Sequence, residues 1–280
     1  MTGRASAYLW AMRIPLISRL LSRKPRVAVI RLSGTIGGAG RGGGLNDAAL
    51  APLIERAFRR GKPLAVALVI NSPGGSPVQS SLIAARIRRL ADETGTPVHA
   101  FVEDVAASGG YWLACAADDI WADDSSILGS IGVISAGFGF HELIDRWGIE
   151  RRVHTAGESK STLDPFRPQS PEDVARLHSI LEPIHAAFKD HVRTRRGSRL
   201  AADQDLFTGA FWAGREAVRL GLADGIAHPV PRLKALYGDK VRFEVHGMRR
   251  PLLRRLGLSA EALLDAAEDR AAFQRFGTRG

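Results

Sequence analysis

The stretch Leu64-Ala-Val-Ala-Leu-Val-Ile70, followed at once by Asn71-Ser-Pro-Gly-Gly75, decides the fold class. Seven consecutive apolar residues predict a strand covered on both faces, because a strand with one solvent-exposed face alternates apolar and polar residues. The proline and the paired glycines end this strand sharply, and apolar residues recur at helical spacing over 78–90. The stretch therefore predicts a buried strand that turns directly into a helix.

The same alternation occurs on either side of this stretch. Residues 27–32 read as a strand, and after a glycine-rich loop Asn46 or Asp47 can cap the next helix. Residues 97–102 read as a third strand, and a helix-like run begins at Tyr111. Three such units in succession predict an α/β fold with a mainly parallel sheet joined by right-handed crossovers.

The second half of the chain contains one long helical pattern, over residues 171–195. Its predicted buried stripe consists of Val174, Leu177, Leu181, Ile184, Phe188 and Val192. Three histidines share this helix, at positions 178, 185 and 191. They form no i,i+4 pair and have no carboxylate on the same face, which indicates surface histidines rather than a metal site. Shorter helices are predicted over 215–220 and 260–275.

Composition restricts the class of protein. A chain of 280 residues with 45% hydrophobic content can bury a sizeable core. The single cysteine, Cys115, excludes an internal disulfide and a cysteine-based metal site, and its apolar neighbours indicate a buried helix position. The net charge of +10 alone does not predict nucleic-acid binding, because the aromatic and basic residues do not alternate as in known modules.

The positive charge is concentrated near the N-terminus. Residues 1–46 contain eight Lys or Arg and no Asp or Glu. Residues 1–25 also carry apolar and aromatic side chains, a mixture that suits the surface of an anionic membrane. Arg13 and Pro15 make this N-terminal arm too short and too charged to span a bilayer. A basic extension without a membrane role is an equal alternative.

Three segments contribute candidate catalytic groups. Ser108, in Ala107-Ser-Gly-Gly110, and the pair Gly74 and Gly75 both follow strands, so the parallel sheet places them at the same edge. Glycines there leave backbone N–H groups free to bind an oxyanion. Lys160, in Gly157-Glu-Ser-Lys-Ser161, could act as a base if buried beside a nucleophile. Taken alone, each segment has an ordinary alternative: a helix cap, a turn, or a solvated loop charge.

Together with two further segments, these motifs resemble the signal peptide peptidase A family, peptidase family S49. The similar segments are Ile70-Asn-Ser-Pro-Gly-Gly-Ser76, Ala106-Ala-Ser-Gly-Gly-Tyr-Trp112, Leu128-Gly-Ser-Ile-Gly-Val133, Gly157-Glu-Ser-Lys160 with Pro165-Phe166, and Phe211-Trp-Ala-Gly-Arg-Glu-Ala217 with Gly221-Leu-Ala-Asp-Gly225. All occur in the family's order and spacing. The resemblance implies the caseinolytic protease/crotonase fold of repeated β-β-α units. It divides the chain into the arm (1–25), a peptidase domain (26–230) and a basic C-terminal extension (231–280).

The resemblance also implies roles for individual residues. Ser108 would be the nucleophile, Lys160 the general base, and Ser130 the serine that orients the lysine amine. Backbone N–H groups of Gly109 and of Gly74 or Gly75 would bind the oxyanion. The implied activity is hydrolysis of apolar peptides, such as signal-peptide remnants, without a cofactor or metal. Family members assemble into rings or domes, so active sites at subunit interfaces of a homo-oligomer are expected. The expected location is the cytoplasm or the inner face of the cell membrane.

Three alternatives remain open. Gly38-Ala-Gly40-Arg-Gly-Gly43 fits the dinucleotide-binding pattern, although no helix opens at Gly43. A crotonase-like acyl-CoA enzyme would use the paired N–H groups but leave the Ser108, Ser130 and Lys160 set without a role. A catalytically silent scaffold at the membrane would account for the basic arm and the basic C-terminal extension.

Overall fold

Strands and helices alternate along the chain much as its sequence predicts. The computed structural model describes residues 25–37, 44–247, 267 and 269–278. Its elements are β1 (Arg26–Ser33), α2 (Asp47–Arg59), β2 (Ala65–Ser72), α3 (Pro77–Thr94), β3 (Val98–Ala107), α4 (Gly109–Ala114), β4 (Asp119–Ala122), β5 (Ile127–Gly129), α5 (His141–Arg146), the 3-10 helix η1 (Glu158–Ser161), α6 (Pro171–Arg196), the 3-10 helix η2 (Gly197–Arg199), β6 (Phe211–Ala213), α7 (Gly214–Arg219), β7 (Gly225–Ile226), α8 (Pro229–Tyr237) and β8 (Arg242–His246). The arm over 1–24 and the glycine-rich residues 38–43 lie outside the described residues.

The described strands form one eight-stranded sheet in the order β6-β5-β3-β2-β1-β8, with β4 and β7 attached beside β3. Within it, only the β5–β6 pair is antiparallel, which confirms the predicted mainly parallel sheet. β8 comes from the predicted C-terminal extension and pairs with β1. The division of the chain at residue 230 stays a prediction.

β2 is buried on both faces, as its apolar run predicts. Val66, Leu68 and Ile70 face the core that contains the side chains of α2, α3 and α4, and the alternate residues face a second, smaller core with α8. Each such side chain that leaves water contributes about 1.5–3 kcal/mol to folding, as an upper estimate. This two-sided burial fixes the strand whose end carries Gly74 and Gly75.

β3 is longer than its sequence pattern indicates. The strand was expected to end near Val102, but it continues to Ala107. Beyond a shift in register against β2, its last residues pair with β5, from Val105 opposite Ile127 to Ala107 opposite Gly129. The sequence does not predict this continuation of the strand, because the polar residues Glu103 and Asp104 interrupt its apolar run. The strand therefore leads straight to Ser108.

The helix caps agree with the sequence. The side chain of Asn46 accepts a hydrogen bond of 2.9 Å from Ala49 N–H at the start of α2, so Asn46 is the cap among the two candidates. α7 ends beside Gly221, which has a φ of 75°. Such a left-handed position after a helix favours glycine.

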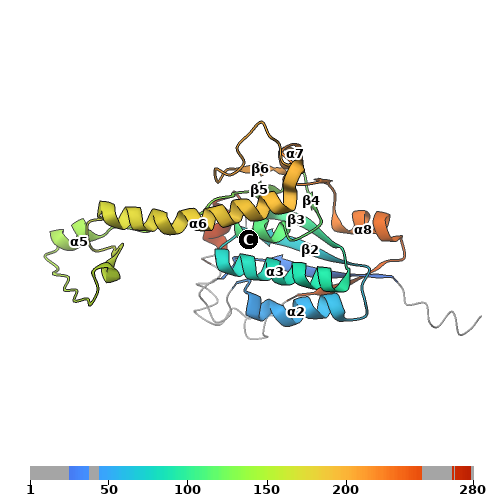
Figure 1. Cartoon of the computed structure of the whole chain (residues 1–280), viewed down its shortest axis with the longest axis horizontal. Helices are drawn as coiled ribbons and strands as arrows, with labels where there is room; N and C mark the ends of the chain where they lie inside the picture. The colour runs from blue at the N-terminus through green and yellow to red at the C-terminus, as the bar shows by residue number, and fades with distance from the viewer. Residues whose placement is uncertain (1–24, 38–43, 248–266, 268, 279–280) are drawn as a thin grey trace, which may run out of the picture.

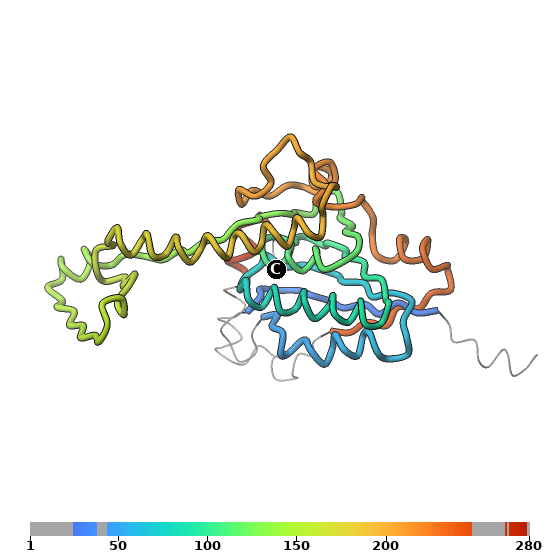
Figure 2. The backbone as a smooth tube through the Cα atoms, in the orientation of Figure 1, coloured from blue at the N-terminus to red at the C-terminus, as the bar shows by residue number. Residues whose placement is uncertain are grey.

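α6 leaves the body of the molecule and carries α5 at its outer end (Figures 1 and 2). Only Phe188, Val192 and Arg196 of this helix are buried. The predicted buried stripe is therefore wrong for the first half of the helix. That half extends past the sheet (Figure 1), and its residues Val174, Leu177, Leu181 and Ile184 are only half-buried. Residues 134–182 are called the projection below. Among the described residues, no helix combines the length and apolar character needed to cross a bilayer.

Candidate active site

Ser108 lies at a strained turn between β3 and α4. Its φ is 51° and its ψ is −121°, a conformation that non-glycine residues rarely adopt. Ser108 N–H donates a hydrogen bond of 2.8 Å to Gly129 O, and Trp112 N–H donates one of 3.0 Å to Ser108 O. The Ser108 side chain makes no capping hydrogen bond to α4, although it occupies the cap position. The helix-cap alternative for this serine is therefore wrong, and its hydroxyl is available for chemistry.

Gly74 touches the backbone that carries Ser108. A Cβ atom added at Gly74 would lie 2.8 Å from Ser108 Cβ and 2.8 Å from Gly109 N, distances that real Cβ atoms do not show. Gly74 also has a φ of 102°. Only glycine fits here, and its presence lets the turn after β2 approach the turn after β3. The two predicted turns therefore meet at one edge of the sheet, as expected.

The backbone N–H groups around this contact differ in what they already bind. Gly74 N–H donates to Ser72 Oγ at 3.3 Å. Gly75 N lies 3.4 Å from the position of a Cβ on Gly109, so the two glycine amides are neighbours. Within the described residues, neither the Gly75 nor the Gly109 N–H donates a hydrogen bond outside a helix or strand ladder. Free N–H groups side by side can bind a developing oxyanion.

Ser130 joins the same cluster. It directly follows β5, is 5% exposed, and has a φ of 53°. Its N–H donates to Ala210 O at 2.7 Å, and the preceding Gly129 accepts the hydrogen bond from Ser108 N–H. The loops of Ser108 and Ser130 are thus joined through their backbones. The structure brings together three segments of the predicted site, those of Gly74-Gly75, Ser108-Gly109 and Ser130.

Lys160 lies elsewhere. It belongs to η1 in the projection, and its side chain is exposed. η1 lies in the outer part of the molecule with α5, near the start of α6 (Figure 1). α6 reaches the body at Phe188, which stacks on Trp112 with ring centroids 4.8 Å apart. Its helical rise places Pro171 roughly 25 Å from that contact. Lys160 and Ser108 therefore do not meet within one copy of the chain.

Asp164 organises the loop that carries Lys160. Its carboxylate accepts hydrogen bonds from Phe166 N–H at 3.0 Å and from the Arg151 guanidinium at 2.8 Å and 3.0 Å. The Phe166 N–H and the Arg151 guanidinium hold the pKa of Asp164 below its usual value. The sequence places Asp164 beside the lysine motif, but its role as the centre of this loop becomes clear only in the structure. The projection thus has a defined local fold although few of its side chains are buried.

Two of the three histidines of α6 contact the body of the molecule, and the third is a surface group. His178 is exposed, as predicted, but His191 Nε2 lies 3.1 Å from Trp112 O and stacks on the Trp112 ring. Burial lowers the pKa of His191. His185 Nε2 lies 3.1 Å from Ile131 O, next to Ser130. In the described part of the chain, no group of three His, Cys, Asp or Glu side chains is placed to hold a metal ion.

Cys115 lies at the end of α4, is fully buried, and has a pKa raised by burial to about 12. This burial confirms the predicted environment. A thiol with so high a pKa is not a nucleophile at neutral pH. Of the nucleophilic side chains on or next to α4, Ser108 alone is suited to attack a substrate.

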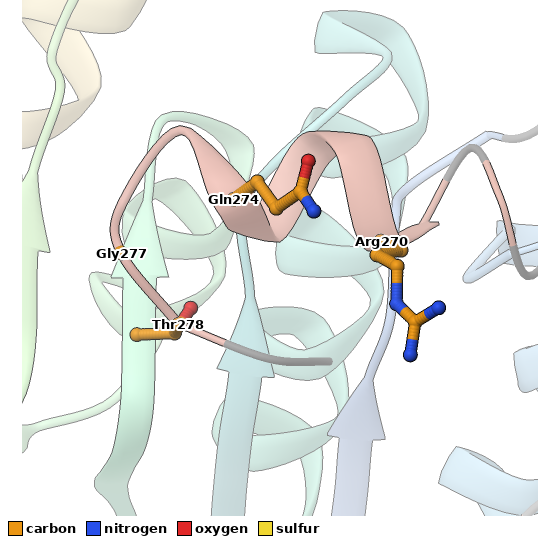
Figure 3. Close-up of a pocket in the computed structure, with 4 residues that line it drawn as sticks. All are labelled: Arg270, Gln274, Gly277 and Thr278. Atoms are coloured by element: carbon orange, nitrogen blue, oxygen red, sulfur yellow. The ribbon is translucent and has the colours of Figure 1, made fainter.

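The C-terminal segment crosses the same end of the sheet (Figure 3). Residues 269–274 are helical, and the rest of the helix predicted over 260–275 lies largely outside the described residues. Asp269 accepts hydrogen bonds from Thr35 N–H and Oγ1, while Phe273 and Phe276 pack on Val105 and Ala107. A cavity of about 460 Å³ lies beside this segment. Its lining residues are Arg270, Gln274, Gly277 and Thr278, and they do not include the candidate catalytic groups.

Comparisons with known proteins agree with these features. The family described as "Peptidase family S49" matches residues 91–229. A Brucella melitensis protein named "Na(+)/H(+) antiporter NhaA" is 46% identical over 94% of this chain and 39% of its own length. "Serine protease SPPA, chloroplastic" of Arabidopsis thaliana is 30% identical over 74% of this chain and 31% of its own length. "Probable protease SohB" of Haemophilus influenzae is 31% identical over 70% and 55%.

This chain therefore spans about a third to a half of the length of these relatives. The antiporter name belongs to a protein of which the chain matches 39%. The matched family and the mainly parallel α/β sheet confirm the predicted caseinolytic protease/crotonase fold class. The chain belongs to peptidase family S49.

Proposed function

We propose that this chain is a serine peptidase in which Ser108 is the nucleophile, Ser130 orients the base, and Lys160 of a second copy is that base. The observation that carries the proposal is the turn at Ser108. Its backbone, with a positive φ, presents a hydroxyl that makes no capping hydrogen bond to α4. This hydroxyl lies beside the N–H groups of Gly75 and Gly109. A nucleophile next to preorganised donors is the arrangement that acyl transfer requires.

In the proposed reaction, Ser108 Oγ attacks the carbonyl carbon of a peptide bond while the neutral Lys160 amine takes the hydroxyl proton. The tetrahedral intermediate then collapses, the C–N bond breaks, and the lysine ammonium returns the proton to the leaving amine. A water molecule, deprotonated by Lys160, next attacks the acyl-serine ester. The bond between the acyl carbon and Ser108 Oγ then breaks, the acid leaves, and the lysine ammonium returns its proton to Ser108 Oγ. Lysine performs this role only where a water-poor site lowers its pKa, so assembly must cover it.

The oxyanion donors in this proposal are the Gly109 and Gly75 N–H groups. Gly74 N–H already donates to Ser72 Oγ, which makes Gly75 the better candidate of the two glycines. Gly74 instead supplies the close backbone contact with Ser108 that aligns the donors. Removing one such donor slows acyl transfer by about 10²–10³-fold in well-studied enzymes.

A second copy of the chain is required because Lys160 is remote from Ser108 in the same copy. The projection has the surface of an interface: Phe138 is 82% exposed and Trp147 is 76% exposed. A cavity of about 1280 Å³ lies beside η1 and the start of α6, next to Lys160. Exposed aromatic side chains around a hollow are typical of surfaces that bury a partner. We therefore propose a homo-oligomer with active sites at its interfaces.

The proposed substrates are apolar peptides, including remnants of signal peptides, at or near the inner face of the cell membrane. One relative, from Enterococcus faecium, is named "Putative signal peptide peptidase SppA" and is 29% identical over 62% of this chain. The basic and apolar residues of 1–25 would favour contact with anionic lipid. The proposed chemistry needs no cofactor, and no nucleic acid takes part.

The proposal is tested by labelling the purified protein with a serine-reactive fluorophosphonate and mapping the modified residue by mass spectrometry. We expect one label on Ser108, together with loss of hydrolysis of a fluorogenic apolar peptide. Ser108→Ala should remove both the label and the hydrolysis. A label on another serine, or hydrolysis retained in Ser108→Ala, would refute the assignment of Ser108.

A further inference from the structure

We infer that His185 is a positioning residue that holds the Ser130 loop in its active conformation. The inference rests on the proposed function, because it assigns a role to the loop that orients the base. The observation is a contact between elements far apart in sequence: His185 Nε2 lies 3.1 Å from the carbonyl oxygen of Ile131, 54 residues earlier. A carbonyl only accepts, so Nε2 carries the proton and donates it.

The Ser130 loop needs such support because its backbone is strained. Ser130 has a φ of 53°, and Gly129 before it has a φ of 112°. A non-glycine residue in the left-handed region is strained and persists only when its surroundings hold it. Ser130 N–H is held by Ala210 O, and Gly132 N–H bonds back to Ser130 O. His185 supplies the anchor on the carbonyl of the residue between them.

α6 holds His185 in a fixed position relative to the body of the molecule. Phe188 and His191, on the following turns, both stack on Trp112, with ring centroids 4.8 Å and 4.9 Å apart. Trp112 belongs to α4, the helix that begins directly after Ser108. One stretch of α6 therefore contacts both loops of the site, the nucleophile loop through Trp112 and the base-orienting loop through His185. The hydrogen bond sets the position of the Ser130 loop relative to Ser108.

The test compares His185→Leu, which fills the space without a donor, with His185→Gln, whose amide can donate to the same carbonyl. His228→Leu serves as the matched control, because His228 is an exposed histidine outside the projection. We expect His185→Leu to lower kcat about five- to tenfold, the loss of one positioning hydrogen bond, with KM within twofold. His185→Gln should restore kcat to within twofold of the natural protein, and His228→Leu should leave it unchanged.

A second readout does not depend on catalysis. Hydrogen exchange at the Ser130 and Gly132 amides should accelerate in His185→Leu but not in His185→Gln, while exchange in β2 stays constant. Unchanged kcat in His185→Leu, equal losses in both variants, or unchanged exchange at these amides would overturn the inference. Absence of turnover in the natural protein would instead refute the proposed function, and the exchange measurement would still decide whether His185 holds the loop.

Discussion

The loops that carry Ser108 and Lys160 differ in what surrounds them. All six residues of α4, which follows Ser108, are buried, and Ser108 itself is bonded to the backbone of the neighbouring Ser130 loop. Neither η1, which contains Lys160, nor α5 has a buried residue. The fold of one copy therefore fixes the loop of Ser108 completely. The loop of Lys160 is shaped locally, by Asp164, and is left exposed; in the proposed function a second copy covers it.

We expect the strongest loss of activity from a substitution in the exposed loop of Lys160 that leaves the buried region around Ser108 unchanged. Lys160→Ala should lower peptide hydrolysis by about 10²–10⁴-fold, because general base catalysis contributes about that much. The free energy of unfolding should not change, since the Lys160 side chain is exposed. Lys240→Ala, which removes another exposed lysine, is the control and should retain full activity. Hydrolysis at the natural rate in Lys160→Ala would exclude lysine as the base.

A stability measurement sharpens the contrast between the two regions. In the body, Arg196 is 3% exposed and bonds Asp224 at 2.7 Å, so Asp224→Ala leaves a buried charge without its partner. We expect urea unfolding to show a loss of about 3–5 kcal/mol. In the projection, the exposed Glu150–Arg152 pair is the counterpart, and Glu150→Ala should leave unfolding unchanged. Equal losses in the two variants would contradict the contrast.

A smaller effect is expected on assembly. Ile149, on the projection, is 58% exposed, and Leu236, on α8, is 42% exposed. If the projection docks on a second copy, Ile149→Ser should weaken association about tenfold, since one buried aliphatic side chain contributes about 1.5 kcal/mol. Leu236→Ser should leave association unchanged. Analytical ultracentrifugation over a concentration series measures both, and equal dissociation constants for the two variants would show that the projection is not the interface.

The smallest effect concerns pH. Burial against Trp112 lowers the pKa of His191 in the folded state, so His191 binds a proton more weakly in the folded chain than in the unfolded chain. The contribution of neutral His191 to the free energy of unfolding is fully present above the pKa of the unfolded chain, near 6.5. It is lost as the pH falls from there through the lower pKa of His191 in the folded state. We expect the unfolding free energy to fall with a slope of at most about 1.4 kcal/mol per pH unit below pH 6.5. His191→Phe should lack this component, and an identical pH profile for both proteins would contradict it.

Much of the body follows from sequence because local patterns and packing agree there. The apolar run 64–70, the cap Asn46 and the glycines at 74 and 75 each predict what the structure contains. The extent of β3 could not be predicted, since Glu103 and Asp104 interrupt its apolar pattern. The burial of α6 could not be predicted either, because a stripe such as Val174 and Leu177 looks the same whether this copy or another covers it. For the same reason, no spacing in the sequence shows that Lys160 lies far from Ser108.

Mixing two inactive variants determines whether Ser108 and Lys160 of different copies form one site. Ser108→Ala and Lys160→Ala proteins are each assayed alone and then after their subunits have been exchanged into mixed assemblies. If the site forms between copies, hydrolysis should return to about a quarter of the natural rate, because half of the copies supply an intact Ser108 and half of their neighbours an intact Lys160. If mixed assemblies form and remain as inactive as either variant alone, the account of a shared site is wrong.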